Sequence, residues 1–227
     1  MKTIAICGLG GSGREVLDLI ERTNNGRWSN IIFCDKNDDL NIFEGYPVYT
    51  FEKIANQYTN EEIEFVISVG DIVLREKIYK QINNAGYDLA TVIASNVYVP
   101  KNTKIENGVI IRDNCYISVG VVIRKNSMIQ PNSTIGHDVV INENSIISAH
   151  TVIAGGVEIG KNVYIGIGCN IKELATIGDD TIVSMGSSVN IDLPSNIIAQ
   201  GNPAQVISKN YLKSAFLLNR LKKNEKK

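Results

Sequence analysis

The sequence predicts two folded parts, an α/β N-terminal half-Rossmann-like domain followed by a left-handed parallel β-helix made of hexapeptide repeats. Two observations predict this arrangement. A glycine-rich turn links a short apolar run to a helical pattern near the N-terminus, and Ile or Val recurs at every sixth position through the second half of the chain. We expect the first domain over residues 1–90, the β-helix over 91–195 and a C-terminal extension over 196–227.

The first expected element is a buried strand over residues 3–7. It is followed by Gly8-Leu9-Gly10-Gly11-Ser12-Gly13, which matches the GxGxxG pattern, and by a helical pattern over residues 14–21. Glycines at such a turn let the backbone approach a phosphate, and the helix N-terminus offers unpaired N–H groups. The motif therefore predicts a nucleotide site, with a purely structural turn as the alternative.

Two further strands complete the expected domain. The strand over residues 31–34 ends in Asp35, which lies 22 residues after Gly13 and could bond ribose hydroxyls or a base. A strand over residues 65–69 ends at Gly70-Asp71, before a helix that carries Leu74, Ile78 and Ile82. A full dinucleotide fold uses two mononucleotide-binding halves. Because the repeat begins near residue 91, we expect one nucleotide here, although an NAD-dependent oxidoreductase is the obvious rival.

The repeat predicts the second domain. Its aliphatic positions are Ile93, Val99, Ile105, Ile111, Ile117, Ile123, Ile129, Ile135, Ile141, Ile147, Ile153, Ile159, Ile165, Ile171, Ile177, Val183 and Val189. A small or short branched residue, such as Ser127, Ser145 or Cys169, stands two places earlier. Three such units close one triangular coil, and coils stack at about 4.8 Å. Branched aliphatic residues then fill the interior.

Glycine and asparagine are expected at the corners of this helix. Gly136, Gly160, Gly166 and Gly178 each follow an aliphatic residue, and Asn126, Asn132, Asn144 and Asn162 recur at equivalent places. Both residue types adopt corner conformations at little cost. The six-residue repeat specifies a fold but no chemistry, so a protein with a purely structural role is the simplest interpretation of the repeat alone.

Composition narrows the classes of protein. The formal net charge of −1 gives no electrostatic reason to expect nucleic acid or an anionic membrane as a partner. No stretch is long and apolar enough to span a bilayer, and the apolar run at residues 3–7 is too short for a signal-peptide core. The cysteines, Cys7, Cys34, Cys115 and Cys169, lack metal-ligand spacing. We expect a cytoplasmic protein with reduced thiols and no metal.

The chain has two histidines, and one of them has an acidic neighbour in sequence. His137 follows the corner residue Gly136 and directly precedes Asp138, whereas His150 has no acidic neighbour in sequence. A carboxylate beside an imidazole fixes its tautomer and favours the imidazolium form, which makes the ring a better general base. His137 is the candidate catalytic base, although an exposed histidine on a repeat surface is more often solvated.

Several motifs together resemble one family. These are Gly8-Leu9-Gly10-Gly11-Ser12-Gly13, Asp35-Lys36, Val69-Gly70, Gly136-His137-Asp138, Ala154-Gly155-Gly156 and Gly201-Asn202-Pro203-Ala204. The combination resembles the sugar acetyltransferases of the sialic acid O-acetyltransferase and bacillosamine N-acetyltransferase group. The resemblance extends from Thr3 to about Lys209. It implies a homotrimer with active sites between neighbouring β-helices, acetyl-CoA as co-substrate, no metal, and a nucleotide-linked amino sugar held by the first domain.

The resemblance also implies roles for individual residues. His137 would be the general base and Asp138 the carboxylate that raises its basicity. The implied sugar-side contacts are Gly10, Gly11, Ser12, Asp35, Lys36 and Gly70. The implied acetyl-CoA contacts are Ile146, Gly155, Ile167 and Met185. At Ile146 some members carry a second histidine that contacts the acetyl carbonyl; isoleucine cannot donate that bond, which leaves oxyanion stabilisation to backbone N–H groups such as that of Gly155.

The leading expectation is N-acetylation of a nucleotide-linked 4-amino sugar for a surface glycan, with acetyl-CoA as donor. The first alternative is O-acetylation of sialic acid or a related sugar, because one base can serve an amine or an alcohol. A nucleotide-binding scaffold without catalysis, or a dehydrogenase-like domain fused to a structural repeat, are alternatives of another class. Within residues 210–227 we expect a short helix that packs on the end of the β-helix or on a neighbouring copy and then a solvated, Lys-rich tail, with capping of the open end as its simplest role.

Overall fold

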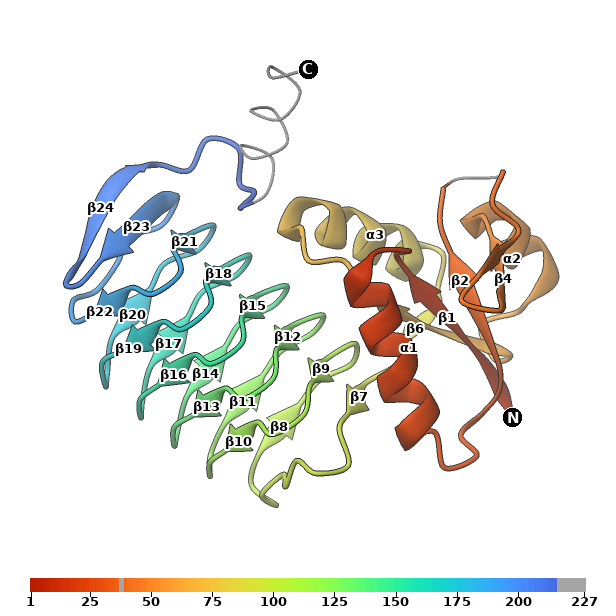
Figure 1. The fold of residues 1–227 in the computed structure, drawn as a ribbon, viewed down its shortest axis with the longest axis horizontal. Coiled ribbons are helices and arrows are strands. Elements are labelled where there is room, and N and C mark those ends of the chain that lie inside the picture. The colour runs from red at the N-terminus through yellow and green to blue at the C-terminus, as the bar shows by residue number, and fades with distance from the viewer. Residues whose placement is uncertain (37–38, 216–227) are drawn as a thin grey trace.

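The computed structural model describes residues 1–36 and 39–215 and has two parts, an α/β domain and a β-helix (Figure 1). The α/β domain contains a six-stranded sheet in the order β3-β4-β2-β1-β5-β6. Its strands are β1 (Lys2–Cys7), β2 (Trp28–Cys34), β3 (Ile42–Phe43), β4 (Tyr46–Tyr49), β5 (Ile63–Ile67) and β6 (Asp88–Leu89). Its helices are α1 (Gly11–Thr23), α2 (Phe51–Gln57) and α3 (Ile72–Asn84).

The strand order reverses at β1. The chain leaves β1 for β2 on one side and later returns to pair β5 on the other, both in parallel. Alternate side chains of β1 pack on opposite layers, since Ile4 and Ile6 join the cluster that contains α1, and Ala5 and Cys7 join the cluster that contains α2 and α3. In open parallel sheets ligands bind outside the carboxyl ends of the strands at such a reversal, and the glycine turn stands at this place.

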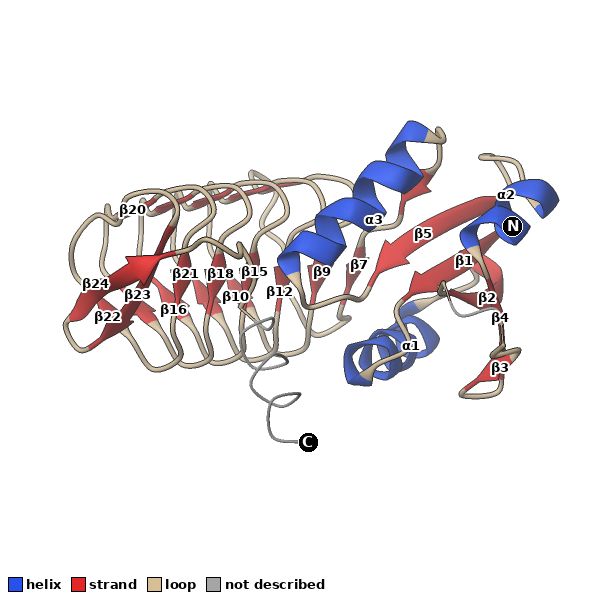
Figure 2. Ribbon diagram, turned by 90° about the horizontal axis from the view of Figure 1, so that it is seen from above, coloured by secondary structure: helices blue, strands red, loops and turns tan. Residues whose placement is uncertain are grey.

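The remaining strands form the left-handed parallel β-helix that the six-residue period predicts, except that the last strand of the chain pairs antiparallel with the one before it (Figure 2). Three faces run along it, and we name each by a central strand. The β15 face contains β7 (Val92–Ile93), β9 (Ile110–Ile111), β12 (Met128–Ile129), β15 (Ile146–Ile147), β18 (Tyr164–Ile165), β21 (Ile182–Val183), β23 (Ile197–Gly201) and β24 (Ala204–Lys209). The β16 face contains β10 (Tyr116–Ile117), β13 (Thr134–Ile135), β16 (Val152–Ile153), β19 (Asn170–Ile171) and β22 (Ser188–Val189). The β14 face contains β8 (Lys104–Ile105), β11 (Val122–Ile123), β14 (Val140–Ile141), β17 (Glu158–Ile159) and β20 (Thr176–Ile177).

The aliphatic ladder fills the interior, as predicted. Ile111, Ile129, Ile147, Ile165 and Val183 stack in one buried column. The short residues two places earlier are buried as well, and their hydroxyls donate to carbonyls of the next coil, as in Ser127 Oγ to Asn142 O, Ser133 Oγ to Ser148 O and Ser145 Oγ to Gly160 O. A polar atom can be buried there because it has a partner.

The two corner residue types serve different purposes. Asn126, Asn132, Asn144 and Asn162 have positive φ and supply the corner conformation, as expected. Gly136, Gly160, Gly166 and Gly178 do not have positive φ. Their role is space, because a Cβ on Gly136 would lie 2.7 Å from the carbonyl carbon of Ala154 in the next coil. The expectation that these glycines supply backbone conformation was therefore wrong.

The α/β domain packs on the β15 face. Outward side chains Ile110, Met128 and Ile146 share one buried cluster with Val16 and Ile20 of α1. The sheet of the first domain ends at β6 and that of the β-helix begins at β7, on either side of the expected boundary at residue 90.

The chain returns to the first domain after the β-helix. Ser214 Oγ bonds the Asp71 carboxylate at the start of α3, and Asn210 Nδ2 donates to Asp180 O at 2.7 Å. Residues 210–215 contain no helix, and the remainder of the segment in which a short helix was expected lies outside the described residues. Within the described part of the chain, no helix is long and apolar enough to cross a membrane.

Candidate active site

His137 and Asp138 form the corner between β13 and β14. Both side chains are exposed, and His137 Nδ1 lies 2.9 Å from Asp138 Oδ2. Asp138 has a φ of 58°, a conformation that aspartate tolerates and that turns its carboxylate back toward the ring. With Nδ1–H donated to the carboxylate, Nε2 carries the lone pair and can accept a proton.

Two glycines in neighbouring coils make room for this pair. A Cβ on Gly155 would lie 2.4 Å from His137 Nε2, and a Cβ on Gly120 would lie 2.3 Å from Asp138 Oδ1. Gly155 was expected at the site, whereas sequence reasoning missed Gly120. Spacing in the sequence could have identified it. Gly120 precedes Asp138 by 18 residues, which is one coil, and Gly155 follows His137 by the same number.

The corner around Gly155 is fixed by backbone hydrogen bonds. Gly156 N donates to His137 O at 2.8 Å, and Leu174 N donates to Gly155 O at 3.0 Å. Among the described residues, the Gly155 N–H has no hydrogen-bond acceptor. It therefore offers a free donor on the residue that His137 Nε2 covers, and a free backbone N–H is the kind of group that stabilises an oxyanion.

The other coenzyme-side residues lie elsewhere on the chain. Ile167 and Met185 are 47% and 71% exposed and stack at the corner between the β15 and β16 faces, away from Gly155. Ile146 is fully buried on the β15 face beneath the first domain. Within one chain, the structure does not bring these three residues together with Gly155.

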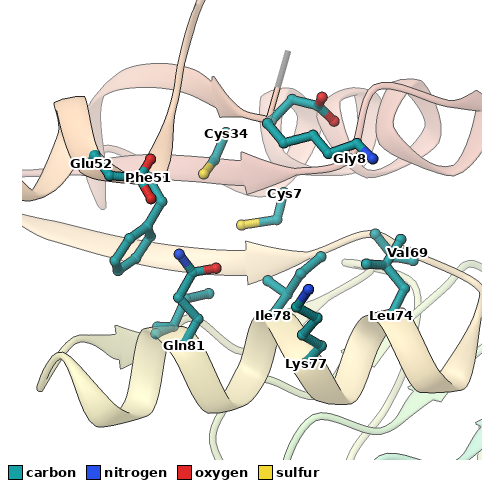
Figure 3. A pocket seen from close by; sticks show the side chains of 13 residues that line it. Cys7, Gly8, Cys34, Phe51, Glu52, Val69, Leu74, Lys77, Ile78 and Gln81 are labelled. Atoms are coloured by element: carbon teal, nitrogen blue, oxygen red, sulfur yellow. The ribbon is translucent and has the colours of Figure 1, made fainter. Parts of the chain in front are cut away.

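A pocket of about 270 Å³ lies at the carboxyl ends of β1 and β2 (Figure 3). Cys7 and Cys34 lie on neighbouring strands and face side chains of α3 such as Ile78 and Gln81. The rest of its wall is formed by Gly8, Asp35, Lys36, Phe51, Glu52, Val69, Leu74, Lys77 and Ile82. Asp35 and Lys36, two of the residues expected to contact a nucleotide, thus line a cavity.

The glycine turn opens beside this pocket. Gly8 has a φ of 117°, which requires glycine, and a Cβ on Gly13 would lie 2.2 Å from Gly8 O. Gly10 is the N-cap residue of α1, Gly11 and Ser12 begin the helix, and no side chain caps it. The N–H groups of the first turn are therefore available to an anion. Gly70 follows β5 next to Val69.

Two buried groups lie near the pocket, the expected reduced thiol of Cys7 and a guanidinium that sequence reasoning missed. The Cys7 thiol has a pKa well above its usual value, because it is hydrogen-bonded to the Cys34 side chain and is buried. Arg75 of α3 is fully buried, and burial lowers its pKa to about 9, so it stays protonated at neutral pH. Its guanidinium donates to Ile67 O and Val69 O at the end of β5 and to Asn126 O in the β-helix, the last at 2.8 Å.

The pocket and His137 lie on opposite sides of the β-helix. The first domain covers the β15 face, whereas His137 stands at the corner between the other two faces. In a triangular cross-section, that corner is the one farthest from the β15 face. The described residues contain no group of His, Cys, Asp and Glu that could hold a metal ion.

The comparisons with known families match both parts of the chain. Residues 3–82 match the PglD N-terminal domain, and residues 120–155 match the bacterial transferase hexapeptide family with six repeats. No curated protein matches the sequence.

Solved structures share the whole fold. The acetyltransferase domain of PglB from Neisseria gonorrhoeae is 23% identical with a TM-score of 0.85, over 91% of this chain and 100% of that chain, and it is also known in complex with acetyl coenzyme A. WeeI from Acinetobacter baumannii is 25% identical with a TM-score of 0.84, over 91% and 100%. PerB from Caulobacter crescentus, in complex with CoA and GDP-perosamine, is 24% identical with a TM-score of 0.72, over 91% and 97%.

Proposed function

We propose that this chain, which joins a PglD N-terminal domain to a transferase hexapeptide β-helix, transfers an acetyl group from acetyl-CoA to the amine of a nucleotide-linked 4-amino sugar. One observation carries the proposal. The His137 ring is paired with Asp138 through Nδ1, and its Nε2 lies over Gly155, whose N–H has no acceptor among the described residues. Structures of similar fold are described as bound to acetyl coenzyme A, or to CoA and GDP-perosamine, which supports the same class of donor and acceptor here.

The reaction needs a general base, a hydrogen-bond donor to the oxyanion, and an amine placed next to the thioester. The amine nitrogen attacks the thioester carbonyl carbon, and His137 Nε2 takes the proton that the nitrogen loses. Asp138 stabilises the imidazolium that forms, and the Gly155 N–H donates to the carbonyl oxygen as negative charge develops. The C–S bond then breaks, and the CoA thiolate receives the proton from His137. No covalent intermediate on the protein is required.

The sugar nucleotide is assigned to the first domain. Its diphosphate would meet the open first turn of α1 at Gly10, Gly11 and Ser12, and its nucleoside would enter the pocket beside Asp35 and Lys36. Gly70 lies at the end of β5, on the other side of the strand reversal. This places the sugar outside the carboxyl ends of the strands.

A homotrimer completes the site. A sugar anchored on the β15 face cannot reach His137 of its own chain, because that residue occupies the opposite corner. A neighbouring copy that presents its His137 corner to the β15 side resolves this difficulty, and it would bring its Gly155 toward the first chain's Ile167 and Met185. The β16 face is suited to such contact, since Tyr116 and Val152 are exposed there. Sugar nucleotides and acetyl-CoA are cytoplasmic metabolites, which favours the cytoplasm as the site of action.

Purified protein tests this function. It is incubated with acetyl-CoA and with UDP-, dTDP- or GDP-linked 4-amino sugars, and free CoA is measured. We expect CoA release with at least one acceptor and a loss of about 100-fold or more in kcat for His137→Ala. Silence with every amino sugar would refute the assigned acceptor, and full activity of His137→Ala would refute the assigned base.

A further inference from the structure

Leu174 has an unusual backbone conformation for its residue type. It occupies a β-helix corner with a φ of 61°, where the equivalent places in the three preceding coils hold Gly120, Asp138 and Gly156. Among the described residues with positive φ, it is the one with an apolar side chain. Bulky residues rarely adopt this conformation, and such strain is concentrated at functional sites.

The side chain of Leu174 lies next to the proposed reaction centre. Its Cδ2 stands 2.7 Å from the position that a Cβ on Gly156 would take, just as His137 Nε2 covers Gly155. The Leu174 N–H also donates to Gly155 O at 3.0 Å, which holds the residue against this corner. His137 and Leu174 therefore flank the Gly155-Gly156 corner from the coils on either side.

Among the described residues, no contact of the Leu174 side chain compensates for its strained backbone. The side chain is 76% exposed, so burial within the chain does not offset the strained backbone. Asparagine occupies the left-handed position at five other β-helix corners, Asn114, Asn126, Asn132, Asn144 and Asn162, and would fit here without strain. An apolar contact with a bound group gives the leucine a function.

We propose that Leu174 sets the length of the acyl chain that the enzyme transfers. The inference rests on the proposed acyl transfer. It assigns the carbonyl oxygen to the Gly155 N–H, the carbonyl carbon to the space near His137 Nε2 and the acyl carbons to the Gly156 side of the corner. Leu174 covers that side. It contacts an acetyl methyl and leaves no room for a longer chain, so the donor it selects is acetyl-CoA rather than propionyl- or butyryl-CoA.

The test compares Leu174→Asn and Leu174→Gly with the wild-type enzyme on acetyl-, propionyl- and butyryl-CoA. Both substitutions suit the left-handed backbone, so the fold is retained. We expect kcat/KM for butyryl-CoA relative to acetyl-CoA to rise about tenfold or more, since one methylene in an apolar pocket changes selectivity by about 10–200-fold. Ile191→Asn, at an exposed aliphatic residue one coil farther along the same edge, should keep the wild-type ratio.

Binding measurements separate this inference from the function on which it rests. The dissociation constants of acetyl-CoA and butyryl-CoA are measured by calorimetry without an acceptor, and light scattering verifies that the oligomeric state is unchanged. A wild-type preference for acetyl-CoA that Leu174→Asn removes supports the inference even if every amino sugar fails as acceptor. An unchanged acyl preference in both variants overturns it, whether or not acetyl transfer occurs, and so does a wild-type enzyme that binds neither thioester.

Discussion

At the scale of residues, the candidate chemistry depends on two adjacent residues, His137 and Asp138, which need different surroundings. His137 needs an open position for its ring, and Gly155 supplies it. Asp138 needs a left-handed backbone that turns the carboxylate toward Nδ1, and the corner supplies it. Adjacency in sequence made this pair predictable, because neighbouring residues at a corner are close whatever the rest of the fold does.

Replacing Asp138 by asparagine tests the carboxylate alone. Asn tolerates the same positive φ and has nearly the same shape, so the unfolding midpoint should not fall. Without a negative charge to fix the tautomer and stabilise the imidazolium, kcat for amine acetylation should fall about 100-fold. Steady-state CoA release measures this loss.

Glu173→Gln is the matched control. It removes an exposed carboxylate from the same edge, two coils from His137, and should leave kcat within about twofold because exposed charges at that distance are screened by solvent. An Asp138→Asn enzyme as fast as the wild type would show that the carboxylate has no part in the reaction.

At the scale of elements, α3 connects the two domains. Arg75 donates to the carbonyls that end β5 and to Asn126 O of the β-helix, and Asn144 Nδ2 donates to Ile72 O at 3.1 Å. The loop at Gly70 is held between these contacts. Sequence reasoning predicted the helix from Leu74, Ile78 and Ile82, but the role of Arg75 depends on the docking of two domains, which no local pattern contains.

Arg75→Met should weaken this connection. Methionine has a similar volume but cannot donate, so buried carbonyls of Ile67 and Asn126 lose their donor at a cost of about 1–3 kcal/mol each. We expect the free energy of unfolding, measured by urea titration, to fall by about 3 kcal/mol. Arg75→Lys should recover part of it, because an ammonium group can still donate. A Met variant as stable as the wild type would mean that the hydrogen bonds of Arg75 contribute little.

At the scale of the whole molecule, the six-residue period predicted the β-helix correctly because one interior position repeats in every unit. The period could not predict the function of Gly136, Gly160, Gly166 and Gly178, which depends on contact between coils 18 residues apart. It also could not show that the nucleotide pocket and His137 lie on opposite sides of the β-helix. That arrangement follows from the face on which the first domain packs.

A shared active site makes a specific prediction for mixed oligomers. His137→Ala removes the base, and Asp35→Ala damages the nucleotide pocket, so each homogeneous variant should be nearly inactive. When equal amounts are assembled together, about a quarter of the sites combine an intact pocket with an intact base from a neighbour, and activity should return to about that fraction. Assembled mixtures as inactive as their components would indicate that each chain uses its own His137.

The central claim is that His137 delivers an acetyl group to an amine. The most direct measurement follows carbon-13-labelled acetyl-CoA by NMR in the presence of a nucleotide-linked 4-amino sugar. The account predicts an amide carbonyl signal on the sugar with the wild-type protein and its loss with His137→Ala. An ester signal on a sugar hydroxyl, or an amide formed equally fast without His137, would contradict it.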